Sequence, residues 1–210
     1  MPILRRRLLQ GAAALLAAAT LALPAIAVGQ STAPATGKIA HHLNPRVKFV
    51  TTDGDFVVEL YPDQAPRTVA NFLQYVRDKQ YDGTIFHRVI KTFMIQGGGY
   101  DIHYQEKPTR APIKNEADNG LKNTPYTIAM ARKPGPDSAT AQFFINVADN
   151  GFLNYTAPTP QGWGYAVFGK VVDGQSVVDK IRDTPTGPGG PFPSDAPQTP
   201  IVIQSVTLLK

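Results

Sequence analysis

"VKFVTTDGDFVVELY", residues 47–61, is where patterned secondary structure begins in this chain. Two segments rich in β-branched and aromatic residues flank Asp53-Gly54, a pair typical of tight turns between antiparallel strands. In the second segment Phe56, Val58 and Leu60 share one face, because side chains alternate along a strand. The stretch therefore predicts a β-hairpin with one apolar face directed at a core.

The segments that follow predict two helices among several short strands. In 65–80, Val69, Phe72, Leu73 and Val76 have the i, i+3, i+4, i+7 spacing of an amphipathic helix. This pattern favours a closed antiparallel barrel capped by helices, with a two-sheet sandwich as the alternative. Closure is favoured because open sheet edges need protection. Strands are predicted at 126–131, 142–147, 166–172 and 201–209, a second helix at 176–181, and surface loops at 100–124 and 184–200.

The stretch "FHRVIKTFMIQGGG", residues 86–99, predicts another hairpin, and its register has a chemical consequence. A two-residue turn would pair Arg88 with Ile95, whereas a three-residue turn would pair Arg88 with Gln96 and Ile90 with Met94. A shift of one residue exchanges the two faces of a strand. The sequence leaves both registers open, but only the longer turn places Arg88 and Gln96 on one surface.

The charge of the chain is concentrated at its N-terminus. The 210 residues carry a formal charge of +5, but without Arg5, Arg6 and Arg7 there remain 18 basic against 16 acidic residues. No basic stretch with interleaved aromatic residues is left, so nucleic-acid binding is not expected. The chain has no cysteine, which excludes disulfides, thiol nucleophiles and thiolate metal sites.

The first residues have the pattern of an export signal. A basic start, an alanine-rich apolar stretch and Ala25-Ile26-Ala27 predict a cleavable leader over 1–27, followed by a flexible linker over 28–45. A retained membrane anchor is the weaker alternative. "RRRLLQ" resembles a twin-arginine signal. We therefore expect a periplasmic protein that is not inserted in the membrane once the leader is removed.

Five motifs carry a family resemblance: "FHRVIKTFMIQGGG", "NEADNG", "TIAMAR", "SATAQFFINVAD" and "GWGYAVFGKVVDG". Together they resemble the cyclophilins, which are peptidyl-prolyl cis-trans isomerases, and most of all their bacterial periplasmic branch. The resemblance covers about 46–210. It implies a mainly β fold, a closed eight-stranded antiparallel barrel capped by two helices.

The resemblance also implies a set of site residues. Arg88 corresponds to the catalytic arginine, and Gln96 is expected to assist it or to hold the substrate backbone. The expected substrate-binding residues are Phe93, Met94, Ala131, Arg132, Gln142, Phe144, Phe152, Leu153 and Tyr165.

Three of these positions depart from the common family pattern. Arg132 replaces an asparagine whose role lies largely in its backbone, Phe152 replaces the tryptophan of cyclosporin-sensitive members, and Tyr165 replaces a histidine. Catalysis is expected to survive these changes, and tight cyclosporin binding is not expected.

The expected chemistry needs no cofactor and no metal, because rotation about an X-Pro bond breaks no covalent bond. The expected partners are proline-containing segments of unfolded or partly folded exported proteins, and the protein is expected to act as a monomer. A binding module that uses the same groove without turnover is the alternative function.

Overall fold

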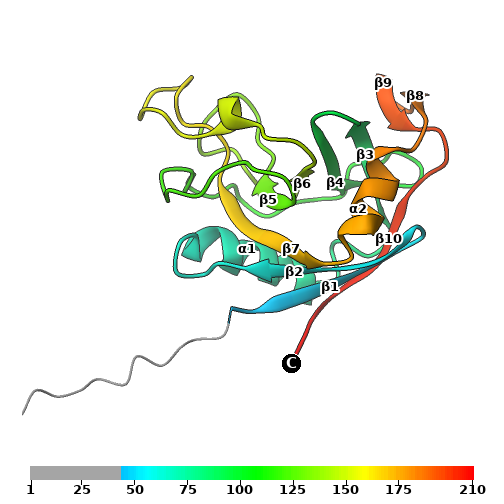
Figure 1. Cartoon of the computed structure of the whole chain (residues 1–210), viewed down its shortest axis with the longest axis horizontal. Coiled ribbons are helices and arrows are strands. Elements are labelled where there is room, and N and C mark those ends of the chain that lie inside the picture. Colours follow the sequence, from blue (N-terminus) through cyan, green and yellow to red (C-terminus); the bar gives the residue numbers. More distant parts are fainter. Residues whose placement is uncertain (1–43) are drawn as a thin grey trace, which may run out of the picture. The chain divides into compact units, whose positions relative to one another are not determined.

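Eight antiparallel strands close into a barrel in the order β1-β10-β3-β4-β6-β5-β7-β2 (Figure 1). The structure is a computed structural model, and it describes residues 44–210. Closure leaves no barrel strand with an open edge, which confirms the barrel and excludes the two-sheet sandwich. The barrel strands are β1 (Arg46–Thr51), β2 (Gly54–Leu60), β3 (Thr84–Ile90), β4 (Met94–Asp101), β5 (Thr127–Met130), β6 (Phe143–Asn146), β7 (Val167–Asp173) and β10 (Val202–Leu208).

The first hairpin forms as predicted, although its turn lies one residue earlier. Thr51 pairs with Gly54, so the turn residues are Thr52 and Asp53 rather than Asp53 and Gly54. The Thr51 hydroxyl causes this shift: it accepts from the Asp53 N–H at 3.1 Å and donates to the Gly54 carbonyl at 2.6 Å. The predicted apolar face of β2 is buried as expected.

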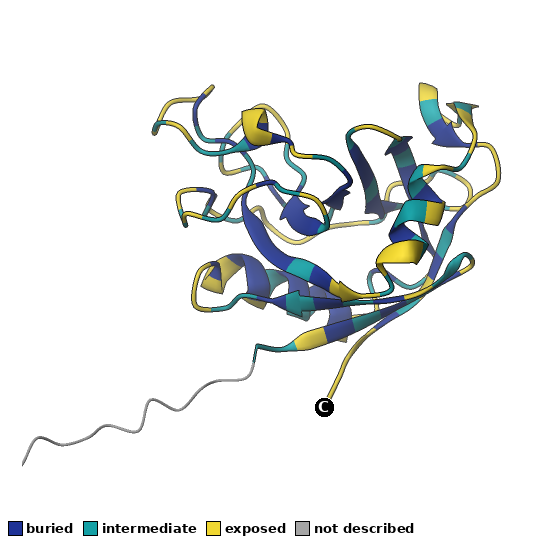
Figure 2. Cartoon of the chain, in the orientation of Figure 1, coloured by how far each residue is buried: buried dark blue, intermediate teal, exposed yellow. Residues whose placement is uncertain are grey.

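Two helices pack against the barrel, α1 (Pro66–Arg77) and α2 (Gln175–Arg182). Val69, Phe72 and Val76 of the predicted stripe are buried, while Leu73 is only partly buried and Tyr75 takes a place in the core. Figure 2 shows the buried residues along the strands and on the inner face of α1, with exposed residues gathered on the loops. The core is aromatic at its centre, where Phe49, Phe56, Phe72, Tyr81, Phe143 and Phe168 are in ring contact.

The start of α1 is capped from a distant loop. Ala65 at the N-cap has no capping side chain, and the first turn of the helix contains no acidic residue. The carboxylate of Glu116 accepts from the backbone N–H groups of Arg67 at 3.1 Å and Thr68 at 2.8 Å, and from the Thr68 hydroxyl at 2.7 Å. Glu116 thus satisfies helix-terminal donors that otherwise have no intrahelical partner.

The β3–β4 hairpin has the three-residue turn. Arg88 pairs with Gln96 and Ile90 with Met94, and the Phe93 N–H closes the turn on the Ile90 carbonyl at 2.9 Å. This register confirms that Arg88 and Gln96 lie side by side. A bulge at His87 precedes them, since Phe86 pairs with Gly97 while Arg88 pairs with the adjacent Gln96. Such a bulge redirects the side chains beside it.

The prediction of an irregular loop over 184–200 was wrong. This segment contains a further antiparallel hairpin of β8 (Thr186–Gly189) and β9 (Phe192–Pro197), and β9 packs against β3 (Figure 1). Its many proline and glycine residues are typical of a loop and led to that prediction. Strands form here nevertheless, because proline is compatible with a strand that has an unpaired edge. We call this segment the outer hairpin.

The remaining boundaries differ from prediction by one to three residues, and the 3-10 turn η1 (Gly151–Leu153) was not predicted. The segment 102–124 is loop, as expected, apart from isolated bridges such as Ile113 with Ala139. The predicted linker ended at 45, yet Pro45 is already part of the domain, because its carbonyl accepts from Leu60 at 2.8 Å. The predicted leader 1–27 and linker positions 28–43 lie outside the described residues. None of the helices in the described part is long and apolar enough to cross a membrane.

Candidate active site

A cavity of about 420 Å³ opens where the β3–β4 hairpin meets β6 and the η1 turn. Ten of the eleven predicted site residues line it, and these residues come from five separate segments of the chain. The exception is Gln142, which lies just outside. The lining residues are Arg88, Phe93, Met94, Gln96, Ala131, Arg132, Phe144, Phe152, Leu153 and Tyr165.

The floor of this cavity is an apolar cluster separate from the barrel core. Met94, Phe144 and Leu153 are buried and pack with Ala129 and Val167. Alternation along the strands explains the separation, because one face of β4 and β6 supplies the barrel core and the other supplies this cluster. The cavity therefore offers a preformed apolar surface to a small apolar ring.

The rim of the cavity is aromatic. Phe152 stacks on Phe93 with ring centroids 5.6 Å apart, and 75% of its surface is exposed. Tyr165 meets Phe144 edge to face at 5.7 Å. A large exposed aromatic side chain contributes little to the core, so Phe152 is available for contact with a ligand.

Arg88 is the one positively charged side chain of the β3 wall of the cavity. Its side chain is 41% exposed, and its Nε lies 3.8 Å from Oδ2 of Asp195 in the outer hairpin. Its side chain makes no hydrogen bond to another residue within 44–210, so its terminal nitrogens are available to a ligand. The sequence patterns did not point to Asp195, because nothing marked its segment as structured.

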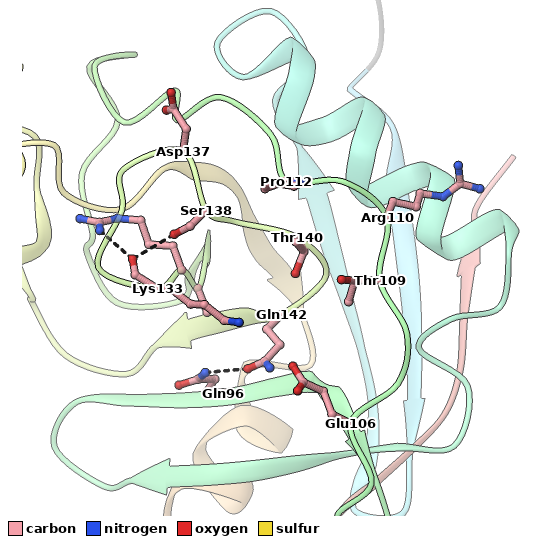
Figure 3. A pocket seen from close by; sticks show the side chains of 12 residues that line it. Gln96, Glu106, Thr109, Arg110, Pro112, Lys133, Asp137, Ser138, Thr140 and Gln142 are labelled. Carbon is pink, nitrogen blue, oxygen red and sulfur yellow. Dashed lines mark hydrogen bonds between the residues drawn. The ribbon is translucent and has the colours of Figure 1, made fainter.

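The hydrogen-bond partner of the Gln96 side chain among the described residues is Gln142 rather than Arg88. The Nε2 of Gln96 donates to Oε1 of Gln142 at 3.0 Å (Figure 3). Gly99 makes room for this pair, because a Cβ at that position would lie 2.5 Å from the Gln142 side chain. The two amides are thus held together, and the carbonyl oxygen of Gln96 remains available as an acceptor.

The Arg132 side chain is fixed by its own loop and by the segment that carries Gly164 and Tyr165. Its Nε donates to the Gly164 carbonyl at 2.9 Å, and its guanidinium carbon lies 4.6 Å from the centre of the Tyr165 ring. Its Nη1 donates to the carbonyl of Lys133 at 3.1 Å. The guanidinium is therefore held in one orientation by stacking and hydrogen bonds, and it forms part of the cavity wall.

A second cavity of about 380 Å³ adjoins the first (Figure 3). Gln96, Ala131 and Arg132 line both, and Gln142 lines only the second. Its other lining residues are mostly polar or charged: Glu106, Thr109, Arg110, Pro112, Lys133, Asp137, Ser138 and Thr140. The two cavities thus form one groove with an apolar end and a polar end, separated by Gln96.

His87, next to Arg88 in sequence, is part of the support behind the site. It is 2% exposed, and burial together with the positive charge of Arg88 lowers its pKa to about 4. The ring is therefore neutral at physiological pH. The described residues contain no group of three or more metal-ligating side chains.

Comparison with known proteins agrees with this geometry. The family model described as cyclophilin type peptidyl-prolyl cis-trans isomerase/CLD matches residues 46–208. A peptidyl-prolyl cis-trans isomerase of Streptomyces antibioticus is 59% identical over 163 residues, covering 78% of this chain and 98% of that protein. Peptidyl-prolyl cis-trans isomerase B of Escherichia coli is 56% identical, covering 77% and 98%.

Solved structures show the same fold. A cyclophilin type peptidyl-prolyl cis-trans isomerase of Cryptosporidium parvum superposes with a TM-score of 0.64 at 28% identity, covering 80% of this chain and 98% of that chain. A structure of that protein in the presence of the dipeptide Ala-Pro gives a TM-score of 0.63 at 27% identity, covering 79% and 99%. The chain therefore belongs to the family of cyclophilin-type peptidyl-prolyl cis-trans isomerases.

Proposed function

We propose that this isomerase holds a proline ring on Met94, Phe144 and Leu153 while Arg88 donates a hydrogen bond to the prolyl nitrogen of the twisted X-Pro amide. The observation that carries the proposal is the position of Arg88, half-exposed on the wall of a cavity whose floor is apolar. One charged donor thus faces a preformed apolar floor.

The reaction is rotation about a partly double C–N bond, with a barrier of roughly 18–20 kcal/mol. When the bond twists, conjugation is lost and the nitrogen regains a lone pair that can accept a hydrogen bond. A donor aimed at that nitrogen stabilises the twisted state more than the planar ground state, which is the condition for catalysis. Arginine suits this role because its guanidinium stays protonated and its fork of donors is rigid.

The free energy of one hydrogen bond from Arg88 is too small to account for the whole catalytic effect. A hydrogen bond that involves a charged group contributes about 1.5–3 kcal/mol, only part of the acceleration expected of an enzyme. The remainder must come from positioning of the substrate. We assign this role to the groups that surround the cavity, namely Gln96, Phe93, Phe152 and the backbone of Arg132. The Arg132 N–H is available for it, because this group donates to no other described residue.

The test is the rate of cis–trans exchange in a proline-containing peptide, measured for the wild type and for Arg88→Ala. We expect kcat/KM to fall roughly ten- to a hundred-fold, since the lost donor acts mainly on the twisted state. Arg46→Ala is the matched control, because it also removes an exposed arginine from an ion pair, with Glu59, but lies outside both cavities. Equal rates for wild type and Arg88→Ala would rule out this role.

We also propose that the protein acts as a monomeric folding catalyst on exported proteins in the periplasm. Support for export comes from the leader-like pattern over 1–27. Expression of the full chain with its leader should yield a periplasmic form that begins after Ala27, detected by fractionation and intact mass. A full-length form in the membrane fraction would contradict it, and light scattering of the purified form would test the monomer.

A further inference from the structure

The side chain of Arg88 has one charged partner among the described residues, and it comes from the segment that sequence patterns indicate as loop. Oδ2 of Asp195 lies 3.8 Å from Nε of Arg88. Asp195 belongs to β9, yet it does not line the cavity, whereas Arg88 does. The carboxylate thus lies nearest the Nε edge of the guanidinium and takes no part in the cavity lining, so it does not occupy the space open to a ligand.

The outer hairpin that carries Asp195 is firmly attached to the barrel. The ring of Phe192 stacks on His87 and meets Tyr100 edge to face, each with centroids 5.3 Å apart. Gly190 lies so close to Tyr104 that any Cβ there would collide with the ring. The base of the hairpin is closed by the Gln198 N–H, which donates to the Pro185 carbonyl at 2.9 Å. A carboxylate on this hairpin therefore has a fixed place relative to β3.

The backbone at Asp195 is unusual for a strand. Its φ is +64°, in the left-handed region that residues other than glycine seldom adopt, at a cost of order 1 kcal/mol. Aspartate and asparagine are among the residues that tolerate this conformation best. The chain therefore adopts a locally unfavourable turn at the position that directs a carboxylate to Arg88.

We propose that Asp195 is a positioning residue for the isomerase reaction, which orients the guanidinium of Arg88 through its Nε edge. This inference rests on the proposed role of Arg88. A long arginine side chain on a strand has several rotamers, and a carboxylate at the Nε edge favours the one that directs the terminal N–H groups into the cavity. Catalysis by a single donor depends on such orientation.

Asp195→Asn is the decisive variant, because asparagine keeps the shape of the side chain and tolerates the left-handed backbone, so only the charge is lost. We expect kcat to fall roughly three- to five-fold, the scale of a partly exposed ion pair, with KM little changed. Asp55→Asn is the matched control, since it removes a similarly exposed carboxylate from an ion pair with Lys48 on the β1–β2 hairpin. It should behave as wild type.

A second experiment, in an Arg88→Lys background, tells whether Asp195 positions Arg88 or merely supports the fold. Lysine has no Nε–H edge, so Asp195→Asn should have no further effect in an Arg88→Lys background. A loss of equal size in both backgrounds would mean that Asp195 merely supports the fold, and it would overturn the proposal. Unchanged or faster turnover of Asp195→Asn would also overturn it, and faster turnover would show that the carboxylate weakens the donor by neutralising it.

The same set of proteins tells the two proposals apart. If Arg88→Ala loses activity while Asp195→Asn does not, the role of Arg88 stands and that of Asp195 fails. If Arg88→Ala keeps full activity, both assignments fail together.

Discussion

Gln96 and Gln142 are joined by a hydrogen bond of 3.0 Å at the boundary between the two cavities. The bond fixes which end of the Gln96 amide faces the apolar cavity, because its NH₂ group is directed at Gln142. An amide held in this way presents its carbonyl oxygen to a bound peptide without losing rotamer freedom at the moment of binding. Gln142 thus acts on the apolar cavity from outside it.

We expect Gln142→Ala to lower kcat/KM roughly two- to ten-fold in the peptide exchange assay, since one neutral hydrogen bond is worth about 0.5–1.5 kcal/mol. Gln96→Ala should lower kcat/KM at least as much, and the double variant should lose no more than Gln96→Ala alone. Gln204→Ala, an exposed glutamine on β10, serves as the control. Full additivity of the two losses would contradict the coupling.

Phe152 and Phe143 should respond in opposite ways to the same substitution. Phe152 is mostly exposed beside the cavity, so Phe152→Ala should change the free energy of unfolding by no more than about 0.5 kcal/mol while raising KM for a proline peptide. Phe143 is fully buried among the core aromatics, so Phe143→Ala should cost about 3–5 kcal/mol of stability. Urea unfolding and peptide kinetics of both variants test this contrast. A large loss of stability from Phe152→Ala would be contrary to it.

His87 should make the stability of the fold depend on pH. Burial lowers its pKa from 6.5 to about 4, so the unfolded chain takes up a proton at higher pH than the folded chain. Above pH 6.5 the ring is neutral in both the folded and the unfolded chain, so His87 does not lower the free energy of unfolding. As the pH falls from 6.5 towards 4, protonation of the unfolded chain lowers that free energy. At 1.36 kcal/mol per pKa unit the full loss is roughly 3 kcal/mol.

The measurement is urea unfolding of wild type and His87→Gln at pH 7.5 and pH 4.5. Carboxylates titrate in both proteins, so the difference between their pH dependences isolates His87. We expect the free energy of unfolding of the wild type to fall by about 2–3 kcal/mol more than that of the variant. Parallel behaviour of the two proteins would show that His87 is not held neutral by burial.

Glu116 should matter for stability although it lies outside the core. Glu116→Gln removes the negative charge that caps α1 and should cost roughly 1–2 kcal/mol of unfolding free energy. Asp118→Asn, an exposed neighbour on the same loop, is the control and should change little. Thermal unfolding of both variants at pH 7 is the test, and equal midpoints would show that Glu116 contributes no more than its neighbour does.

Local patterns predicted the elements that depend on burial of one face. Alternation in β2 correctly predicted which face of that strand is buried. The helical spacing of Val69, Phe72 and Val76 did the same for α1. The choice between barrel and sandwich also followed correctly from the rule that sheet edges must be protected. The motifs within 86–174 identified the lining of the apolar cavity almost completely.

The outer hairpin could not be recognised in this way. Its strands contain glycine and proline at positions where a core strand would have β-branched residues, and their one aromatic side chain is Phe192. What holds the hairpin in place is the His87–Tyr100 surface, which is assembled by β3 and β4. A pattern within one segment carries no information about a surface made by two others.

The barrel class, the two helices, the family and the residues around the cavity could all be inferred from the amino-acid sequence. These depend on periodicity and on motifs, which are local properties of the chain. The folded structure was needed to establish the register that sets Arg88 beside Gln96, the partner that Gln96 binds, and the approach of Asp195 to Arg88. Each of those is a distance between side chains from separate segments, and such distances exist only after the barrel has closed.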